Sequence, residues 1–111
     1  MNTQDIIEQI GLKSLSKFEH REVDGVIISD MISDVMAVAK SGNLWITIQT
    51  HRSIIPAAHL VDVSAIIIAH GKEVPQETID LASKHNVPIV ATELSTFELA
   101  GKLHELGLGK Y

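Results

Sequence analysis

The chain has 111 residues, no cysteine, and nine basic against fourteen acidic residues, for a formal net charge of -5. The absence of cysteine excludes disulfides, thiol catalysis, and every Cys-ligated zinc or iron–sulfur site. The length predicts one domain spanning residues 1–111. We expect no nucleic-acid partner, because the chain is acidic and poor in aromatic residues. We expect a cytoplasmic protein without a membrane partner, because the sequence has no signal peptide and no apolar run of membrane length.

Apolar runs and helical repeats alternate along the chain. Short apolar segments rich in β-branched residues predict buried strands, and apolar residues spaced three and four apart predict helices. In chain order the patterns predict a helix over 3–10, a strand over 26–28, a helix over 32–39, a strand over 44–48, a helix over 54–61, a strand over 65–69, a helix beginning at Pro75, a strand over 88–92 and a helix following Ser95.

Polar residues, prolines and glycines mark the expected helix ends. Thr3 is the predicted N-cap of the first helix. Pro56 fits only a first helical turn, which starts its helix near Ser53, and Pro75 suits the first helical position. Ser95 and Glu98 have capping-box spacing. Leu94 and Leu99 are placed to form a hydrophobic staple around that box, and Gly107 is expected to end the last helix.

Several large side chains are predicted to face the core. Trp45 lies in a strand and is expected in the core or an interface, and Met31 and Met36 are interpreted as core filling. Phe97 falls on the apolar stripe of the last helix. His59 is expected to be half-buried. A further short strand is a weaker prediction within residues 15–18.

Uniformly apolar strands, each followed by a helix, are typical of a parallel sheet covered on both faces. The sequence therefore predicts an α/β fold with three layers, α/β/α, around a mainly parallel sheet of about five strands. No phosphate loop is present, because Ile66 and Glu73 stand where its first glycine and its hydroxyl residue would be. The GxGxxG, GxSxG and HExxH motifs are also absent.

Polar residues gather where the predicted strands end. Parallel strands deliver their carboxyl ends to one edge of a sheet, where ligands bind. Arg52 and Lys72 can hold a phosphate or carboxylate, and His51 and His70 can act as bases, pH-responsive groups or metal ligands. The candidate ligand-binding residues are Asp30, His51, Arg52, His70, Gly71, Lys72 and Thr92.

Simpler interpretations stay open for these residues. Polar residues are common in any loop that follows a strand, and Ser29, Ser53 and Ser95 serve equally well as helix caps. A favourable interaction with the macrodipole of the following helix is a sufficient explanation for Asp30. Two histidines with one carboxylate form a thin ligand set, so we expect no metal site and no cofactor.

The segment 24–97 resembles a DRTGG domain. The matching features are Gly42 before a strand, His51-Arg52 at the family's Asp-Arg pair, Ala69-His70-Gly71 at its Thr-Gly-Gly, Pro75, Pro88-Ile89 and Thr96-Phe97. Such domains occur beside CBS domains in some pyrophosphatases and in some phosphotransacetylases, and are similar to the N-terminal domain of HPr kinase/phosphorylase. Of the five residues that name the family, only Arg52 and Gly71 are retained, so roles of the replaced residues do not carry over.

The resemblance implies a layered α/β fold, a regulatory or ligand-sensing role and frequent dimerisation. We therefore expect a free-standing, non-catalytic domain that binds an anionic metabolite, a nucleotide or a partner protein at its strand ends, and forms a homodimer. The alternative is a small enzyme that uses His51 and His70 in acid–base or phosphoryl-transfer chemistry. The missing phosphate loop favours the binding domain over a kinase.

Overall fold

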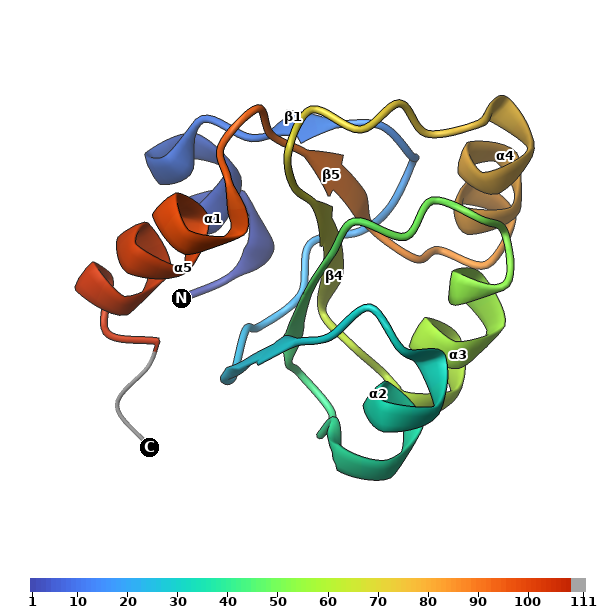
Figure 1. Cartoon of the computed structure of the whole chain (residues 1–111), viewed down its shortest axis with the longest axis horizontal. Helices are drawn as coiled ribbons and strands as arrows, with labels where there is room; N and C mark the ends of the chain where they lie inside the picture. The colour runs from blue at the N-terminus through green and yellow to red at the C-terminus, as the bar shows by residue number, and fades with distance from the viewer. Residues whose placement is uncertain (109–111) are drawn as a thin grey trace.

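The computed structural model describes residues 1–108, so residues 109–111 of the expected domain lie outside the description. Figure 1 shows helices on both sides of a central sheet. In chain order the elements are α1 (Thr3–Ile10), β1 (Lys13–Ser14), β2 (Val26–Ile28), α2 (Ile32–Val38), β3 (Leu44–Thr47), α3 (Ile54–Val61), β4 (Ala65–Ile68), α4 (Gln76–Lys84), β5 (Ile89–Ala91) and α5 (Thr96–Glu105).

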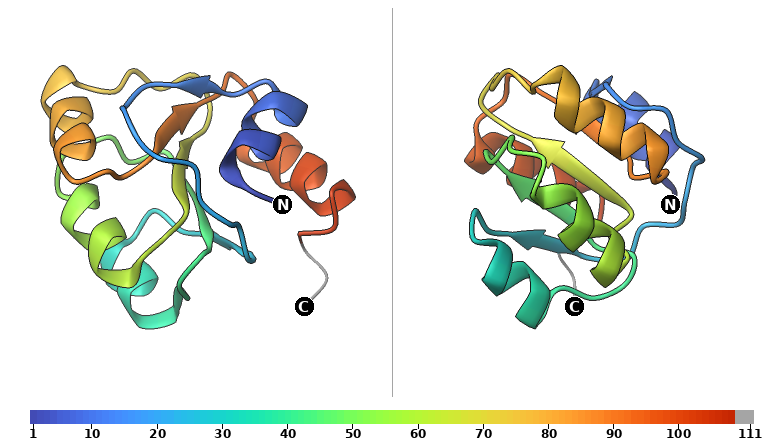
Figure 2. Two further views of the ribbon diagram at one scale, coloured as in Figure 1. Left: turned by 180° about the vertical axis from the view of Figure 1, so that it is seen from behind. Right: turned by 90° about the vertical axis from the view of Figure 1, so that its right-hand side faces the viewer.

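The sheet has five strands in the order β1-β5-β4-β3-β2. The strands β2 to β5 are parallel neighbours in chain order, and β1 pairs antiparallel with β5 at one edge. Successive crossovers of one hand place α2, α3 and α4 on the same face, while α1 and α5 cover the other face (Figures 1 and 2). The three-layer α/β/α fold with a mainly parallel five-stranded sheet is confirmed.

The core consists of two apolar clusters, one on each face of the sheet, because successive side chains of a strand point to opposite faces. Trp45, Ile66 and Ile89 are fully buried on the α2–α4 face. Ile46, Ile67 and Val90 are buried with α1 and α5 on the other face. Both faces of β3 and β4 are covered, which explains why these strands are apolar at almost every position.

Two predicted helix starts are wrong by one residue. Asn2, not Thr3, caps α1: its side chain accepts from the Asp5 amide, and the Asp5 carboxylate accepts from the Asn2 amide. The Thr3 hydroxyl instead contacts His20 and accepts from the Arg21 amide. Pro75 is the N-cap of α4 rather than its first helical residue. The capping box of Ser95 and Glu98 is present as predicted.

The predicted burial of four side chains is also wrong. Met31 and Met36 are exposed rather than core filling, and Phe97 is 87% exposed. His59 lies on the exposed side of α3, where its ring contacts His85. The buried side of α5 carries Leu99 and Leu103, and Phe97 lies about 200° around the helix from Leu99, on the side that faces away from the sheet.

The first strand lies earlier than the weak prediction of 15–18. β1 comprises Lys13 and Ser14, and its register pairs Lys13 with Ala91. The chain then stays close to β5, since the Leu15 amide donates to the Ile89 carbonyl at 2.9 Å. Among the residues described, no helix is long and apolar enough to cross a membrane.

Candidate ligand-binding site at the carboxyl ends of β4 and β5

A groove of about 850 Å³ lies where β4 and β5 end. Its walls come from the end of α1, from β1, from the loops that follow β4 and β5, and from the first two turns of α5. Apolar side chains, among them Leu15, Val74 and Ile79, contribute to the lining. The volume lies within the range of about 300–1,000 Å³ that is common for small-molecule sites.

The groove occupies the topological switch point of the sheet. The loop after β4 leads to α4 on one face, whereas the loop after β5 leads to α5 on the opposite face (Figure 1). Neighbouring loops that diverge in this way leave a crevice at the carboxyl edge, which is where open α/β sheets bind ligands.

Backbone hydrogen bonds hold the two diverging loops together at the base of the crevice. The His70 amide donates to the Leu94 carbonyl at 2.8 Å, and the Gly71 amide donates to the Thr92 carbonyl at 2.9 Å. Both His70 and Gly71 have positive φ angles, of 64° and 63°. The positive φ of Gly71 favours glycine, and a β-carbon there would also displace the carboxylate end of the Glu93 side chain.

The His70 ring is a cap for α5. Its Nε2 accepts from the Thr96 amide at 3.1 Å, and the Thr96 hydroxyl lies 3.2 Å from the same nitrogen. An acceptor at Nε2 places the ring proton on Nδ1. The histidine that replaces a family glycine thus keeps the left-handed backbone and satisfies an unpaired helix amide.

Three lysines line the groove: Lys13 on β1, Lys72 in the loop after β4, and Lys102 on α5. Among residues 1–108 none of them forms an ion pair, whereas Arg21 and Arg52 each pair with a carboxylate. Lysine side chains that line one groove without forming an ion pair can hold an anion.

Three carboxylates also line the groove, but two have structural contacts. The Glu98 carboxylate accepts from the Ser95 amide, and this hydrogen bond, followed by one to the Ser95 side chain, lowers the pKa of Glu98. Glu93 lies against Gly71. The third acidic residue is Glu73, in the same loop as Lys72. The groove therefore offers both signs of charge, and among residues 1–108 neither its lysines nor its carboxylates form an ion pair.

The predicted site residues separate into groups. Gly71, Lys72 and Thr92 line the groove, and His70 lies beside it as the cap of α5. Asp30 lies in the loop after β2, and its carboxylate reaches the end of β3, where it accepts from the Thr47 hydroxyl and the Ile48 amide.

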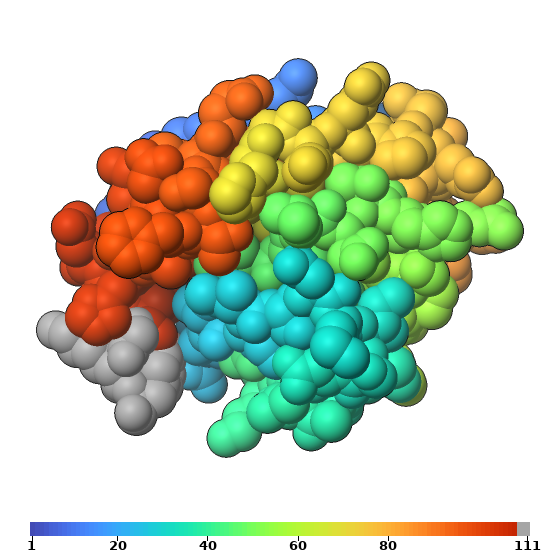
Figure 3. Space-filling view, viewed as in Figure 1, coloured from blue at the N-terminus to red at the C-terminus, as the bar shows by residue number. Residues whose placement is uncertain are grey.

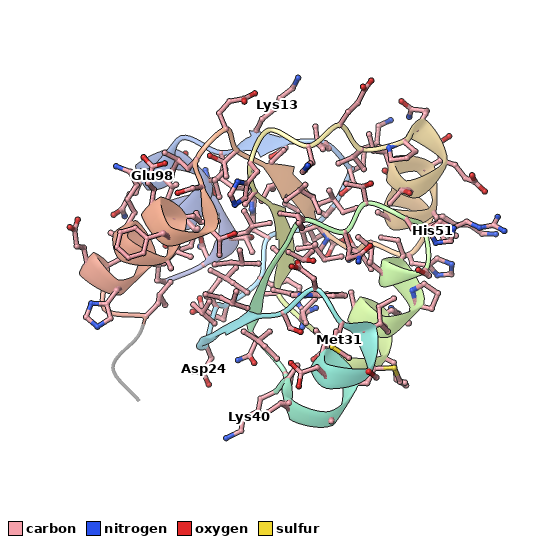
Figure 4. The ribbon with its side chains drawn as sticks, in the orientation of Figure 1. Lys13, Asp24, Met31, Lys40, His51 and Glu98 are labelled. Carbon is pink, nitrogen blue, oxygen red and sulfur yellow. The ribbon has the colours of Figure 1, made fainter. Side chains whose placement is uncertain are left out.

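His51 and Arg52 lie outside the groove. Figure 4 shows His51 on the opposite side of the molecule from Glu98. Its Nδ1 accepts from the Ser53 amide at 3.1 Å and lies 2.9 Å from the Ser53 hydroxyl. Arg52 pairs with Glu77 of α4 at 2.6 Å and lines a separate surface groove.

The prediction from sequence omitted Lys13, Lys102, Glu93 and Glu98. Lys102 and Glu98 share one side of α5 at a spacing of four residues, a weak signal that many surface helices carry. Lys13 reaches the groove only because the two residues of β1 pair antiparallel with β5. A strand this short has no periodicity to detect.

A family model described as the DRTGG domain matches residues 5–106. The chain belongs to the DRTGG domain family. No curated protein sequence matches this DRTGG domain. The family's arginine and second glycine are present as Arg52 and Gly71, and the histidines at positions 51 and 70 have the local capping contacts described above.

Among solved structures, this DRTGG domain is similar to the CBS and DRTGG domains of the regulatory region of Clostridium perfringens pyrophosphatase, crystallised with its activator diadenosine tetraphosphate. The TM-score is 0.70 at 18% sequence identity, and the match covers 91% of this chain and 45% of that chain. The chain thus spans less than half of that structure, and at this identity the likeness establishes the fold.

Proposed function

We propose that this DRTGG domain is a non-catalytic regulatory domain that binds an anionic metabolite or nucleotide in the groove between β4 and β5. The observation that carries the proposal is that Lys13, Lys72 and Lys102 line one partly apolar groove at the switch point of the sheet, and none of them is ion-paired within residues 1–108. Apolar lining suits the flat body of a nucleobase, and the lysines suit its phosphates.

The similar pyrophosphatase structure supports the same ligand class. Its regulatory region binds diadenosine tetraphosphate, a polyanion that carries two nucleosides. Nucleotides and dinucleoside polyphosphates are therefore the first ligands to test, and a protein partner is the other class that the strand-end loops can accept. We infer that the domain regulates a process in the cytoplasm rather than catalysing a reaction.

The contacts of the two candidate catalytic histidines support a structural role. His51 and His70 each use one ring nitrogen as an acceptor for a backbone amide at the start of a helix. A general base needs that lone pair for a substrate proton. The Ser53 hydroxyl is close to His51, but the Ser53 amide already donates to the same nitrogen.

Isothermal titration calorimetry with a panel of nucleotides and dinucleoside polyphosphates tests the proposal. Alanine at Lys13, Lys72 or Lys102 is expected to weaken binding by about tenfold or more each, because a charge-assisted hydrogen bond contributes about 1.5–3 kcal/mol. Lys40→Ala is the matched control, since Lys40 lies at the opposite end of the molecule from Lys13 (Figure 4). Equal affinity in all four variants would place the ligand elsewhere.

A second assay separates binding from catalysis. The protein is incubated with each nucleotide that binds, with Mg²⁺ and with HPr, and products are separated by chromatography. We expect no turnover. Turnover that disappears in His51→Ala or His70→Ala would support the enzyme alternative instead.

We further infer that the domain forms a homodimer. The exposed side chains of Met31 and Met36 support this, whereas Trp45 is fully buried and contributes no surface. Two-fold dimers are the commonest soluble oligomers. Light scattering should return twice the 12.1 kDa of one chain, and a mass of one chain at high concentration would contradict the inference.

A further inference from the structure

The strand β2 is apolar, and among residues 1–108 no strand pairs with its outer side. Its three residues, Val26, Ile27 and Ile28, are all β-branched, and none is buried. The segment that contains β2 and α2 occupies the middle of the surface in Figure 3. No charged residue, proline or bulge interrupts the strand, although such features commonly prevent the edges of sheets from pairing.

The hydrogen-bond pattern shows which backbone groups of β2 face away from the sheet. The Gly25 carbonyl accepts from the Leu44 amide, and the Ser29 amide donates to the Ile46 carbonyl. In a parallel pair, alternate residues bond to the neighbouring strand, so Ile27 also faces β3. The amides and carbonyls of Val26 and Ile28 therefore point outward, away from β3.

Apolar side chains flank this backbone on both sides. Ile28 is 50% exposed, Met31 is 65% exposed, and Ile48 beyond the end of β3 is exposed too. On the α2 side, a groove of about 360 Å³ is lined by Val26, Ile27 and Val38. A partner on the edge would remove the exposed parts of these side chains from water.

We propose that a second copy of this chain pairs with β2 in antiparallel orientation, about a two-fold axis at Ile27, to give one continuous sheet across the dimer. This inference rests on the proposed homodimer and assigns its interface. Val26 of each copy then lies opposite Ile28 of the other, and the outward groups of these residues form four backbone hydrogen bonds. Closed two-fold symmetry requires an interface that matches itself.

The spacing of the outward groups is self-complementary, as pairing about a two-fold axis requires. Two outward residues, placed symmetrically on either side of Ile27, complement their own copy without any offset. The side chains match in the same way, because Ile27 meets Ile27 on one face while Val26 meets Ile28 on the other. Cross-strand pairs of β-branched residues stabilise antiparallel sheets.

The acidic residues at the two ends of β2 are compatible with this pairing. In the proposed register Asp24 lies opposite Asp30 of the partner. Asp30, however, turns its carboxylate towards β3, where it accepts from the Thr47 hydroxyl and the Ile48 amide. Lys40 lines the same groove as Asp24 and supplies a positive charge beside it.

Sedimentation velocity across a concentration series is the first test. Ile28→Lys places a charge beside the symmetry axis, and we expect the dimer dissociation constant to rise by about 100-fold or more, because an unpaired charge is costly to bury. Leu60→Lys is the matched control, since Leu60 is 69% exposed on α3 and lies outside the proposed interface. Its dissociation constant should equal that of the unmodified protein.

Disulfide cross-linking tests the register. Because the sequence has no cysteine, only an introduced cysteine can form the disulfide. Residues directly opposite at a non-hydrogen-bonded position lie about 4.5 Å apart between Cα atoms, close enough for a disulfide. Under mild oxidation Ile27→Cys should therefore give a covalent dimer. Ile28→Cys should not, because its two copies would be more than about 7 Å apart.

The outcomes distinguish the proposed β2 interface from the proposed homodimer on which it rests. A monomeric unmodified protein overturns both the homodimer and its interface. A dimer that persists in Ile28→Lys, or that cross-links at position 28 but not 27, keeps the homodimer and overturns the β2 pairing. Circular dichroism of every variant establishes that a lost dimer is not a lost fold.

Discussion

The two edges of the sheet differ in almost every property. At one edge, β1 is two residues long, antiparallel, and carries the exposed side chain of Lys13. At the other, β2 is parallel, apolar and open, with Ile28 half exposed. The first edge adjoins the groove that we propose for a small anion, and the second is the edge that we propose for a second copy.

The difference follows from how each edge is covered. The β5 side is wrapped by β1 and by loops that run to opposite faces, so its polar groups are drawn into one crevice. On the β2 side the chain continues from the strand into α2, and among residues 1–108 no further strand pairs with β2. A short charged strand limits pairing, whereas an uncharged open strand permits it.

Removing the support beneath the β2 edge is expected to have the largest effect. Trp45 is fully buried, and its indole Nε1 donates to the Ser29 carbonyl at 2.8 Å. Trp45→Ala should lower the free energy of unfolding by about 3–5 kcal/mol, through a lost side chain and a cavity. Urea denaturation followed by circular dichroism measures this, because the variant has no tryptophan fluorescence.

Trp45→Phe refines that result. It keeps a large aromatic side chain but loses the hydrogen bond to Ser29, so it should cost less than alanine does. If this variant also weakens the dimer, the turn that Trp45 holds is part of the interface. An unchanged stability in Trp45→Ala would contradict the packing described for the α2–α4 face.

A smaller effect is expected at the base of the groove. Gly71→Ala must adopt a positive φ angle, at a cost of about 1–2 kcal/mol, and must also displace the Glu93 carboxylate. Gly11→Ala is the matched control, because Gly11 has a φ of 81° but nothing near its missing β-carbon. Thermal unfolding should therefore show a larger loss of stability for Gly71→Ala than for Gly11→Ala.

Repeating the Gly71→Ala measurement in a protein that also carries Glu93→Ala shows whether the Glu93 side chain causes the larger loss of stability at Gly71. Without the carboxylate, the penalty at Gly71 should fall to the value at Gly11. Equal penalties at both glycines in the native background would show that Glu93 moves aside freely and does not shape the groove.

The smallest expected effect is a dependence of folding stability on acidic pH, through the Glu98 carboxylate beside the groove. The pKa of Glu98 is lowered, first by the hydrogen bond from the Ser95 amide and then by that from its side chain. The folded state binds a proton on Glu98 less readily than the unfolded chain does. This contribution to stability is therefore present above the ordinary pKa of 4.5 and is lost as the pH falls through the lowered value.

Glu98→Gln should flatten the stability profile below about pH 5 while leaving the β2 edge unaffected. Denaturant titrations at several pH values provide the measurement, with dimer mass recorded in parallel. A profile that keeps its slope in Glu98→Gln would assign the acid dependence to other carboxylates. Asp62 is one of these, since its pKa is also lowered, most strongly by the hydrogen bond from Ser41.

Local chemistry predicted the elements that depend on neighbouring residues. The strands around Trp45 and Ile67 were found from apolar runs, because both of their faces are buried and every position carries the signal. The capping box of Ser95 and Glu98 was found because both partners lie within one helical turn. The failure at Met31 and Phe97 has the opposite cause, since their exposure depends on which side of a helix, or of the turn before it, packs against the sheet.

The candidate site divides in the same way. Gly71, Lys72 and Thr92 were predicted because parallel strands bring their carboxyl ends to one edge. Lys13 and Lys102 were not, because they reach the groove from an antiparallel edge strand and from a helix that folds back beside it. The contacts of His51 and His70 could not be predicted from the sequence, because a histidine that caps a helix and one that binds a ligand occur in similar sequence patterns.

By itself, then, the sequence determined the order of helices and strands, the parallel sheet and the family pattern around Arg52 and Gly71, because these depend on periodicity and on residues close along the chain. Only the tertiary structure decided which polar residues meet in one groove and which edge of the sheet stays open. The physical reason is that both depend on how the layers overlap, a property that arises from contacts between residues far apart in the chain.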